Sequence, residues 1–140
     1  MSSAYSPWAD LAARPDLTLV WQPMVGRVGE YVHALRLIRL DPRMPRRQAR
    51  AVLAHELRHA DAADTLTQCA HVNLRQEQRA DRTAARLLID VHQLADAMVL
   101  HDRRHSAVAV ELHVSDRLLG VRLDHLHPSE RAFLTRRLAD

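Results

Sequence analysis

The sequence predicts an α+β fold, with a small N-terminal sheet packed on an active-site helix and a C-terminal half built from helices. Short segments rich in Val, Leu, Trp and Tyr occur before residue 41, as in the strands of a small sheet. Apolar side chains then recur at spacings of three and four, as on buried faces of helices. Because 140 residues are too few for two ordinary domains with a linker, we expect residues 1–140 to form a single domain.

The amino-acid composition of the chain indicates what kind of core, partner and location to expect. Hydrophobic residues make up 47% of the chain but include only one Phe, two Tyr and two Trp, so the core is expected to be aliphatic. The net charge of +3 is modest for a dedicated binder of phosphate backbones. The single cysteine, Cys69, cannot form an intramolecular disulfide and is expected to be a buried apolar filler. With no signal-like start and no apolar run of about 20 residues, the sequence predicts a cytoplasmic protein without a membrane role.

The first 40 residues are expected to form a short helix followed by the sheet. Ser6 before Pro7 is typical of a helix N-terminus, and Pro15 follows its end. The sheet is expected within residues 17–40, with strands at about 17–21, 27–33 and 35–40.

Two helices are expected after the sheet. Pro45 suits the first turn of a helix over about residues 45–62. A second helix, over about 74–89, is predicted by an apolar stripe, with Asn73 as its cap.

The remaining chain, about residues 91–139, is also expected to be helical. Asp90 is the expected cap of the first helix there, and Ser129 that of the last. In between, residues 107–112 and 117–126 are expected to form a helix pair.

The motif with chemical meaning is H-E-x-x-H at residues 55–59. On a helix, His55 and His59 lie on one face and can bind the same ion. Glu56 is rotated by about 100° from His55, so it can accept a proton from water without binding the metal. With ten histidines in the chain, chance alone yields roughly 0.025 such motifs, so a third ligand is needed to support a metal site.

The next helix supplies that candidate in Glu77, with Asp81 four residues later on the same face. Glu77 can complete a site of two histidines and one carboxylate for a single Zn²⁺ ion. Asp81 can accept the remaining ring N–H of a ligating histidine. Alone, the two carboxylates are more simply solvated partners of nearby arginines. Beside an H-E-x-x-H helix, we favour the metal site.

Two stretches resemble the ImmA/IrrE family of zinc metallopeptidases. RAVLAHELRHA at residues 50–60 is similar to its active-site helix, and EQRADRTAARLL at 77–88 is similar to its E-x-x-A-[DN]-x-x-A-x-x-L-L helix. Residues 29–31, 38–41 and 114–126 resemble its edge strand, the strand before the zinc helix and its C-terminal helices. The resemblance implies a minimal zincin-like domain, with His55, His59 and Glu77 as zinc ligands and Glu56 as the catalytic base.

The resemblance also implies a protein substrate, namely a helix-turn-helix transcriptional repressor of a mobile element or stress response that the enzyme cuts at a specific site. Two positions depart from the family pattern. Arg58 replaces a glycine found in many members, which raises the question of how closely a substrate approaches that face. No proline follows Asp90, so the connection after this helix is expected to differ.

Two alternatives remain. Residues 107–119 have the outline of a DNA-binding helix-turn-helix, with Arg117 and Arg122 on the second helix. Gly120 and the acidic Asp116 and Asp124 oppose direct nucleic-acid binding there. The other alternative is a zinc-stabilised interaction domain without activity, which the presence of Glu56 argues against. The other histidines and Tyr31 are expected to be ordinary surface or half-buried residues.

Overall fold

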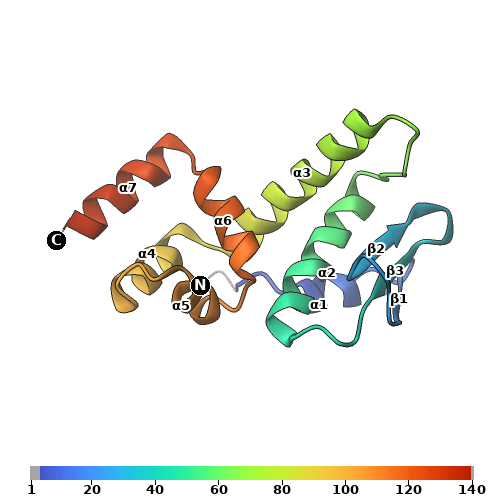
Figure 1. The fold of residues 1–140 in the computed structure, drawn as a ribbon, viewed down its shortest axis with the longest axis horizontal. Helices are drawn as coiled ribbons and strands as arrows, with labels where there is room; N and C mark the ends of the chain where they lie inside the picture. The colour runs from blue at the N-terminus through green and yellow to red at the C-terminus, as the bar shows by residue number, and fades with distance from the viewer. Residues whose placement is uncertain (1–3, 140) are drawn as a thin grey trace.

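The computed structural model of the chain describes residues 4–139 (Figure 1). It has the predicted α+β fold, with a three-stranded sheet in its N-terminal half and a C-terminal half of helices. The elements in chain order are α1 (Pro7–Ala12), β1 (Thr18–Trp21), β2 (Gly29–Val32), the 3-10 helix η1 (His33–Leu35), β3 (Leu37–Leu40), α2 (Arg46–Asp61), α3 (Ala70–Leu88), α4 (Val91–Leu100), α5 (His105–Glu111), α6 (Asp116–Asp124) and α7 (Pro128–Ala139).

The sheet has the strand order β1-β3-β2, with β3 parallel to β1 and antiparallel to β2. Ile38 and Leu40 of β3 are fully buried because the central strand packs against α2. The predicted third strand began too early, since residues 33–35 form η1. Arg36, with φ of 49°, then takes the left-handed conformation that reverses the chain between the antiparallel strands. Strand β2 lies at the edge of the sheet.

Helix α2 lies between two hydrophobic cores. Leu53 and Leu57 face the sheet, where they join Ile38 and Leu40 in one core. Ala51 and the fully buried Ala54 belong to the other core, formed with α3 and the C-terminal helices. Because α2 contributes apolar side chains to both cores, the whole helix is fixed from two sides. The candidate site residues that it carries are fixed with it.

Helix α3 crosses α2 and connects the two halves of the molecule (Figure 1). Its buried face carries Ala80 and Ala84, both with no exposed area. Such short side chains let two helices approach closely, so polar groups one turn away on α3 can reach those of α2.

The beginning of α3 differs from its prediction. The helix starts at Ala70, and Asn73 lies inside it. The side chain of Asn73 instead accepts hydrogen bonds from the N–H and hydroxyl of Thr67, at 2.9 and 2.8 Å, and donates to the Thr67 carbonyl at 2.9 Å. It therefore fixes the loop between α2 and α3. Cys69 in this loop is exposed, contrary to the buried filler that we expected.

The C-terminal helices confirm one predicted cap and correct another. Asp90 caps α4, since its carboxylate accepts the N–H groups of His92 and Gln93 at 3.1 Å each. Ser129 does not cap α7, because the helix already starts at Pro128. Glu130, the third residue of α7, instead accepts a hydrogen bond from the backbone N–H of His127 at 3.1 Å. The acidic residue of a capping box makes the same bond.

The N-terminal segment is attached to the sheet and to α2 by aromatic and charged contacts. Trp8 of α1 stacks on Trp21 of β1, with ring centroids 6.0 Å apart. Asp10 of α1 accepts a hydrogen bond of 2.6 Å from Arg58 of α2.

Among the residues described, none of the helices combines the length and apolar character that a membrane crossing requires.

Candidate metal centre

His55 and His59 lie on one face of α2, one turn apart, as the motif predicts. Their side chains are buried, with residue exposures of 8% and 6%. The two Nε2 atoms point toward each other and are 3.0 Å apart. The chain thus brings two imidazole nitrogens to one point in the interior.

Glu77 of α3 faces this point from the neighbouring helix. Its Oε2 lies 2.9 Å from His55 Nε2, and its Oε1 lies 2.9 Å from His59 Nε2. One donor atom from each of the three residues lies within 4.8 Å of the others, which is compatible with a single metal ion. Glu77 is the exposed member of the set, so the side opposite the helices remains accessible.

The other ring nitrogen of each histidine contacts an aspartate. His55 Nδ1 lies 2.7 Å from Asp81 of α3, and His59 Nδ1 lies 2.8 Å from Asp64 in the following loop. Because an ionised carboxylate only accepts hydrogen bonds, each Nδ1 carries a proton. With Nδ1 occupied in this way, Nε2 is the nitrogen of each ring that faces the common point and could bind a metal ion.

The charges around this point favour a cation. Burial opposes protonation of His55, but the hydrogen bonds to Asp81 and Glu77 outweigh it and raise the pKa of His55 to about 10. Hydrogen bonds from the two histidines hold the pKa of Glu77 well below its usual range. A positive charge is thus stabilised between the three side chains, and one metal ion matches both their charge and their donor atoms.

Glu56 lies next to His55 in the chain, and its carboxylate approaches the edge strand β2. It is only 6% exposed, and burial raises its pKa to about 7 although the neighbouring histidines favour its charged form. A Cβ atom placed on Gly29 of β2 would lie 3.4 Å from Glu56 Oε1, so the edge strand passes next to this carboxylate. With its pKa near 7, this carboxyl group can exchange a proton near neutral pH.

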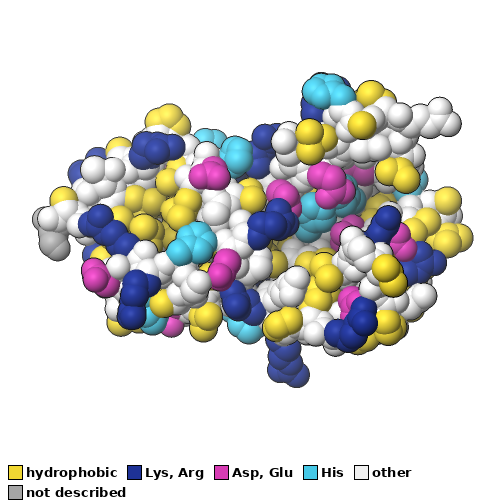
Figure 2. Space-filling model, in the orientation of Figure 1, with side chains coloured by type: hydrophobic (Ala, Val, Ile, Leu, Met, Phe, Trp, Pro, Cys, Tyr) yellow, Lys and Arg dark blue, Asp and Glu magenta, His cyan; other side chains and the backbone are white. Residues whose placement is uncertain are grey.

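A cleft of about 700 Å³ runs between β2, the α2–α3 loop and α3. Its walls include Glu56, His59 and Glu77 together with the residues of β2. Histidine and carboxylate side chains gather at the hollow on the face seen in Figure 2. Tyr31 and His33 also line the cleft, joined by a hydrogen bond of 2.7 Å between the Tyr31 hydroxyl and His33 Nδ1.

The structure resolves the question raised by Arg58. Its guanidinium bonds to Asp10 and lies 5.6 Å from the ring centroid of Tyr5, so the side chain is directed at the N-terminal segment. Arg58 is absent from the cleft lining and belongs to the packing of α1 on α2.

The two arginines of the proposed DNA-reading helix are both engaged within the protein. Arg122 is 3% exposed and donates to the Ile89 carbonyl and to Glu130. Arg117 donates two hydrogen bonds to Asp81, at 2.8 and 2.9 Å. These contacts leave the helix pair without the free guanidinium groups that base or phosphate recognition needs.

Sequence reasoning missed Asp64, Arg79 and Arg117 around the histidines. Asp64 lies beyond the end of α2, where helical periodicity gives no information. The sequence feature that indicates Asp64 is an acidic residue five positions after His59, just beyond the end of a helix.

A helix with two histidines, joined by a carboxylate from the next helix beside a small mixed sheet, defines the class of metal-dependent peptidases. The sequence model of the IrrE N-terminal-like domain, peptidase family M78, matches residues 17–124. The chain belongs to this family, which confirms the resemblance inferred from its motifs, and the family supports a metallopeptidase-type function on a protein substrate. No curated protein and no solved structure matches the chain.

Proposed function

We propose that the protein is a zinc-dependent endopeptidase in which His55, His59 and Glu77 bind the ion and Glu56 is the general base. The observation that carries this proposal is the convergence of the three donor atoms within 4.8 Å at the wall of the cleft. Two imidazole nitrogens and one carboxylate, open on a further side, are the donor set of catalytic zinc sites. We also propose that residues 1–140 act as one domain, because α2 contributes to both cores.

The proposed reaction is hydrolysis of a peptide bond. His55, His59 and Glu77 would hold the zinc ion, which when bound would supply Lewis-acid polarisation of the scissile carbonyl and lower the pKa of water. Glu56 accepts a proton from the water as its oxygen adds to the scissile carbonyl carbon. It then delivers the proton to the leaving nitrogen, and the C–N bond breaks to give a carboxylate and an amine. The buried position of Glu56 keeps its pKa near 7, where both transfers are accessible.

The substrate is proposed to bind as an extended segment along β2. This strand lies at the edge of the sheet, and all its residues line the cleft. An edge strand offers main-chain N–H and C=O groups to an added strand. Gly29 lets that backbone pass close to Glu56, since no side chain stands between them. A cleft of about 700 Å³ suits a short exposed linker of a folded target.

The proposed target is a helix-turn-helix transcriptional repressor, cut at one site so that repression is relieved. The support is the association of ImmA/IrrE peptidases with such repressors, and it is an argument by family analogy.

The test is to incubate the zinc-loaded protein with the repressor encoded beside its gene and to follow the products by mass spectrometry. We expect one discrete cut, abolished both by a chelator and by Glu56→Gln. The Glu111→Gln variant, changed at an exposed carboxylate of α5, is the matched control and should cut normally. An intact repressor, with unrelated unfolded proteins degraded, would contradict the regulatory role and leave a general peptidase. If no protein is cut, the peptidase proposal itself is wrong.

A further inference from the structure

The turn that ends α2 directs one side chain back at the metal centre. Ala63 takes the left-handed conformation, with φ of 53°. The N–H of Asp64 donates to the His59 carbonyl at 3.0 Å, and the N–H of Ala63 donates to the Ala60 carbonyl at 3.1 Å. This pair of bonds is a Schellman motif, in which the residue after the left-handed position lies over the residue five before it. The motif therefore places Asp64 beside His59.

The Asp64 side chain uses this position to contact the imidazole. It is buried, with an exposure of 8%, and its Oδ2 accepts the hydrogen bond from His59 Nδ1 at 2.8 Å. Schellman motifs usually place an apolar pair at these two positions. Burying a carboxylate there is costly unless it is paired, and Arg79 of α3 contacts the same oxygen.

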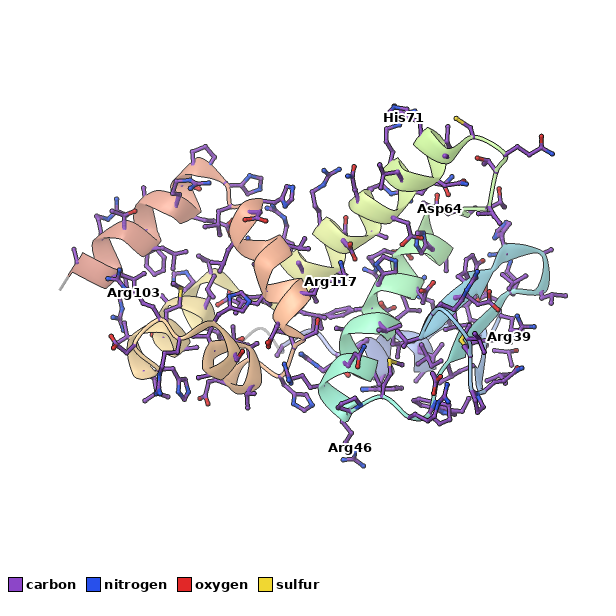
Figure 3. All side chains as sticks on the ribbon, viewed as in Figure 1. Arg39, Arg46, Asp64, His71, Arg103 and Arg117 are labelled. Carbon is purple, nitrogen blue, oxygen red and sulfur yellow. The ribbon has the colours of Figure 1, made fainter. Side chains whose placement is uncertain are left out.

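His55 has a matching arrangement on the other side of the centre. Asp81 accepts from His55 Nδ1 at 2.7 Å and is contacted by Arg117. In Figure 3, Arg117 extends from α6 toward the crossing of α2 and α3, and Asp64 lies near the other end of α2. Each histidine thus contacts an aspartate, which in turn contacts an arginine. The aspartate and arginine beside His55 come from different parts of the chain than those beside His59.

We propose that Asp64 is a positioning residue for His59, fixing its ring orientation and its Nδ1 proton so that Nε2 binds the metal. Arg79 contacts the Asp64 carboxylate and holds it in place, as Arg117 does for Asp81. This inference rests on the proposed metal ligands, but it concerns a residue outside the H-E-x-x-H and E-x-x-x-D patterns. The competing explanation is that Asp64 only joins the turn to α3 through Arg79.

The test compares two variants that differ in the hydrogen-bond acceptor. Asp64→Leu supplies the apolar residue that Schellman motifs accommodate, so it should fold, but it leaves His59 Nδ1 without an acceptor. Asp64→Asn keeps an oxygen that can accept the same bond. Zinc affinity is measured by competition with a chromophoric chelator, and the melting temperature of each metal-free protein is recorded. The matched control is Asp61→Asn, at the exposed end of α2.

We expect Asp64→Leu to weaken zinc binding by about 10 to 100-fold, with Asp64→Asn restoring affinity to within a few-fold of the parent. Asp61→Asn should leave the affinity unchanged. Equal affinity of Asp64→Leu and the parent, whatever the melting temperatures, would overturn the positioning role and leave Asp64 as a staple to α3. The same conclusion follows if Asp64→Asn binds as weakly as Asp64→Leu.

The readout also separates this inference from the proposed function. If the Asp64 variants change zinc affinity as expected but the parent protein cuts no peptide, the proposed peptidase activity is wrong and the positioning role of Asp64 stands. If Glu77→Ala and His59→Ala bind zinc as tightly as the parent, the metal centre is wrong, and the positioning role fails with it.

Discussion

The two halves of the molecule bury charge in different ways. Among the described residues, all but one of the buried polar or charged side chains lie between Asp41 and Asp64, and the exception is Arg122 in the C-terminal half. Arg122 is fully paired, with hydrogen bonds to the Ile89 carbonyl and to both oxygens of Glu130. In the N-terminal half, the Nε2 atoms of His55 and His59 instead face one point shared with Glu77, and Glu56 and His59 line the cleft.

This difference separates a structural use of buried charge from a functional one. A buried group that satisfies its partners internally contributes to packing, whereas a group that needs an external cation or substrate lowers the stability of the free protein. Substitutions in the N-terminal half should therefore change binding and catalysis first. Substitutions in the C-terminal half should change the free energy of unfolding first.

The largest expected effect is on the ligands of the metal. Glu77→Ala and His59→Ala should each lose most of the bound zinc, because each removes one of three donors. Glu56→Gln should retain the metal and lose hydrolysis. Metal analysis of the purified variants measures this, and Glu130→Gln serves as the control that keeps its zinc. Equal zinc content in all the variants would contradict the ligand assignment.

The next effect concerns stability in the C-terminal half. Glu130→Gln leaves the buried Arg122 without its carboxylate partner and should reduce the free energy of unfolding by about 3 kcal/mol. Urea unfolding at pH 7 measures it, with Glu111→Gln at an exposed position as the control. A loss of zinc without a loss of stability would reverse the proposed division between the halves.

The same pair predicts a pH dependence. The hydrogen bonds from Arg122 lower the pKa of Glu130 from 4.5 to about 2 in the folded protein. The contribution of the pair is therefore fully present above pH 4.5 and is lost as the pH falls toward 2. The difference in stability between the parent and Glu130→Gln should shrink over this range. A constant difference would show that the ionised carboxylate is not its source.

A smaller effect is expected where the halves meet at Asp81. Asp81→Ala should weaken zinc affinity by about 10 to 100-fold, since the side chain orients His55 without supplying a donor atom. Asp96→Ala, at an exposed salt bridge of α4, is the control. An unchanged affinity would return Asp81 to the simpler role of a partner for Arg117.

A last comparison uses one glycine from each half, and its smaller effect falls in the C-terminal half. In Gly29→Ala the new Cβ would clash with Val52 and lie 3.3 Å from Leu40 Cδ2, so we expect a loss of about 1–3 kcal/mol and weaker activity. In Gly120→Ala no heavy atom lies within 4 Å, and the helix interior should gain about 0.5–1 kcal/mol. Thermal unfolding of both variants measures the contrast. Equal shifts would mean that the approach of β2 to α2 is not tight.

Helical periodicity explains which parts of the site the sequence could predict. His55, His59, Glu77 and Asp81 lie within helices, where spacings of four residues place side chains on one face. Asp64 follows the end of a helix, and its orientation depends on the backbone of Ala63, which the residue type did not indicate. Arg117 comes from a distant segment through a tertiary contact, so no local pattern could reveal it.

The boundaries of the helices and strands were likewise predictable only where local residue type determines them. The start of α4 follows residue type, as the cap at Asp90 illustrates. The start of α3 was predicted late because its first turn, before Asn73, has no apolar stripe, and Asn73 bonds to Thr67 in the preceding loop. Residues 33–35 adopt η1 because the chain must turn between β2 and β3, which strand-forming residue types do not reveal.

The stacked Trp8 and Trp21 give the protein a fluorescent reporter of the contact between α1 and β1. The sequence has two tryptophans, and both lie where α1 meets β1. Intrinsic fluorescence therefore follows the detachment of α1 from the sheet and is blind to the helices beyond α3. Circular dichroism at helical wavelengths weights those helices instead. If the two cores open separately on heating, the two signals will give different midpoints, and if α2 couples them, one midpoint will serve for both.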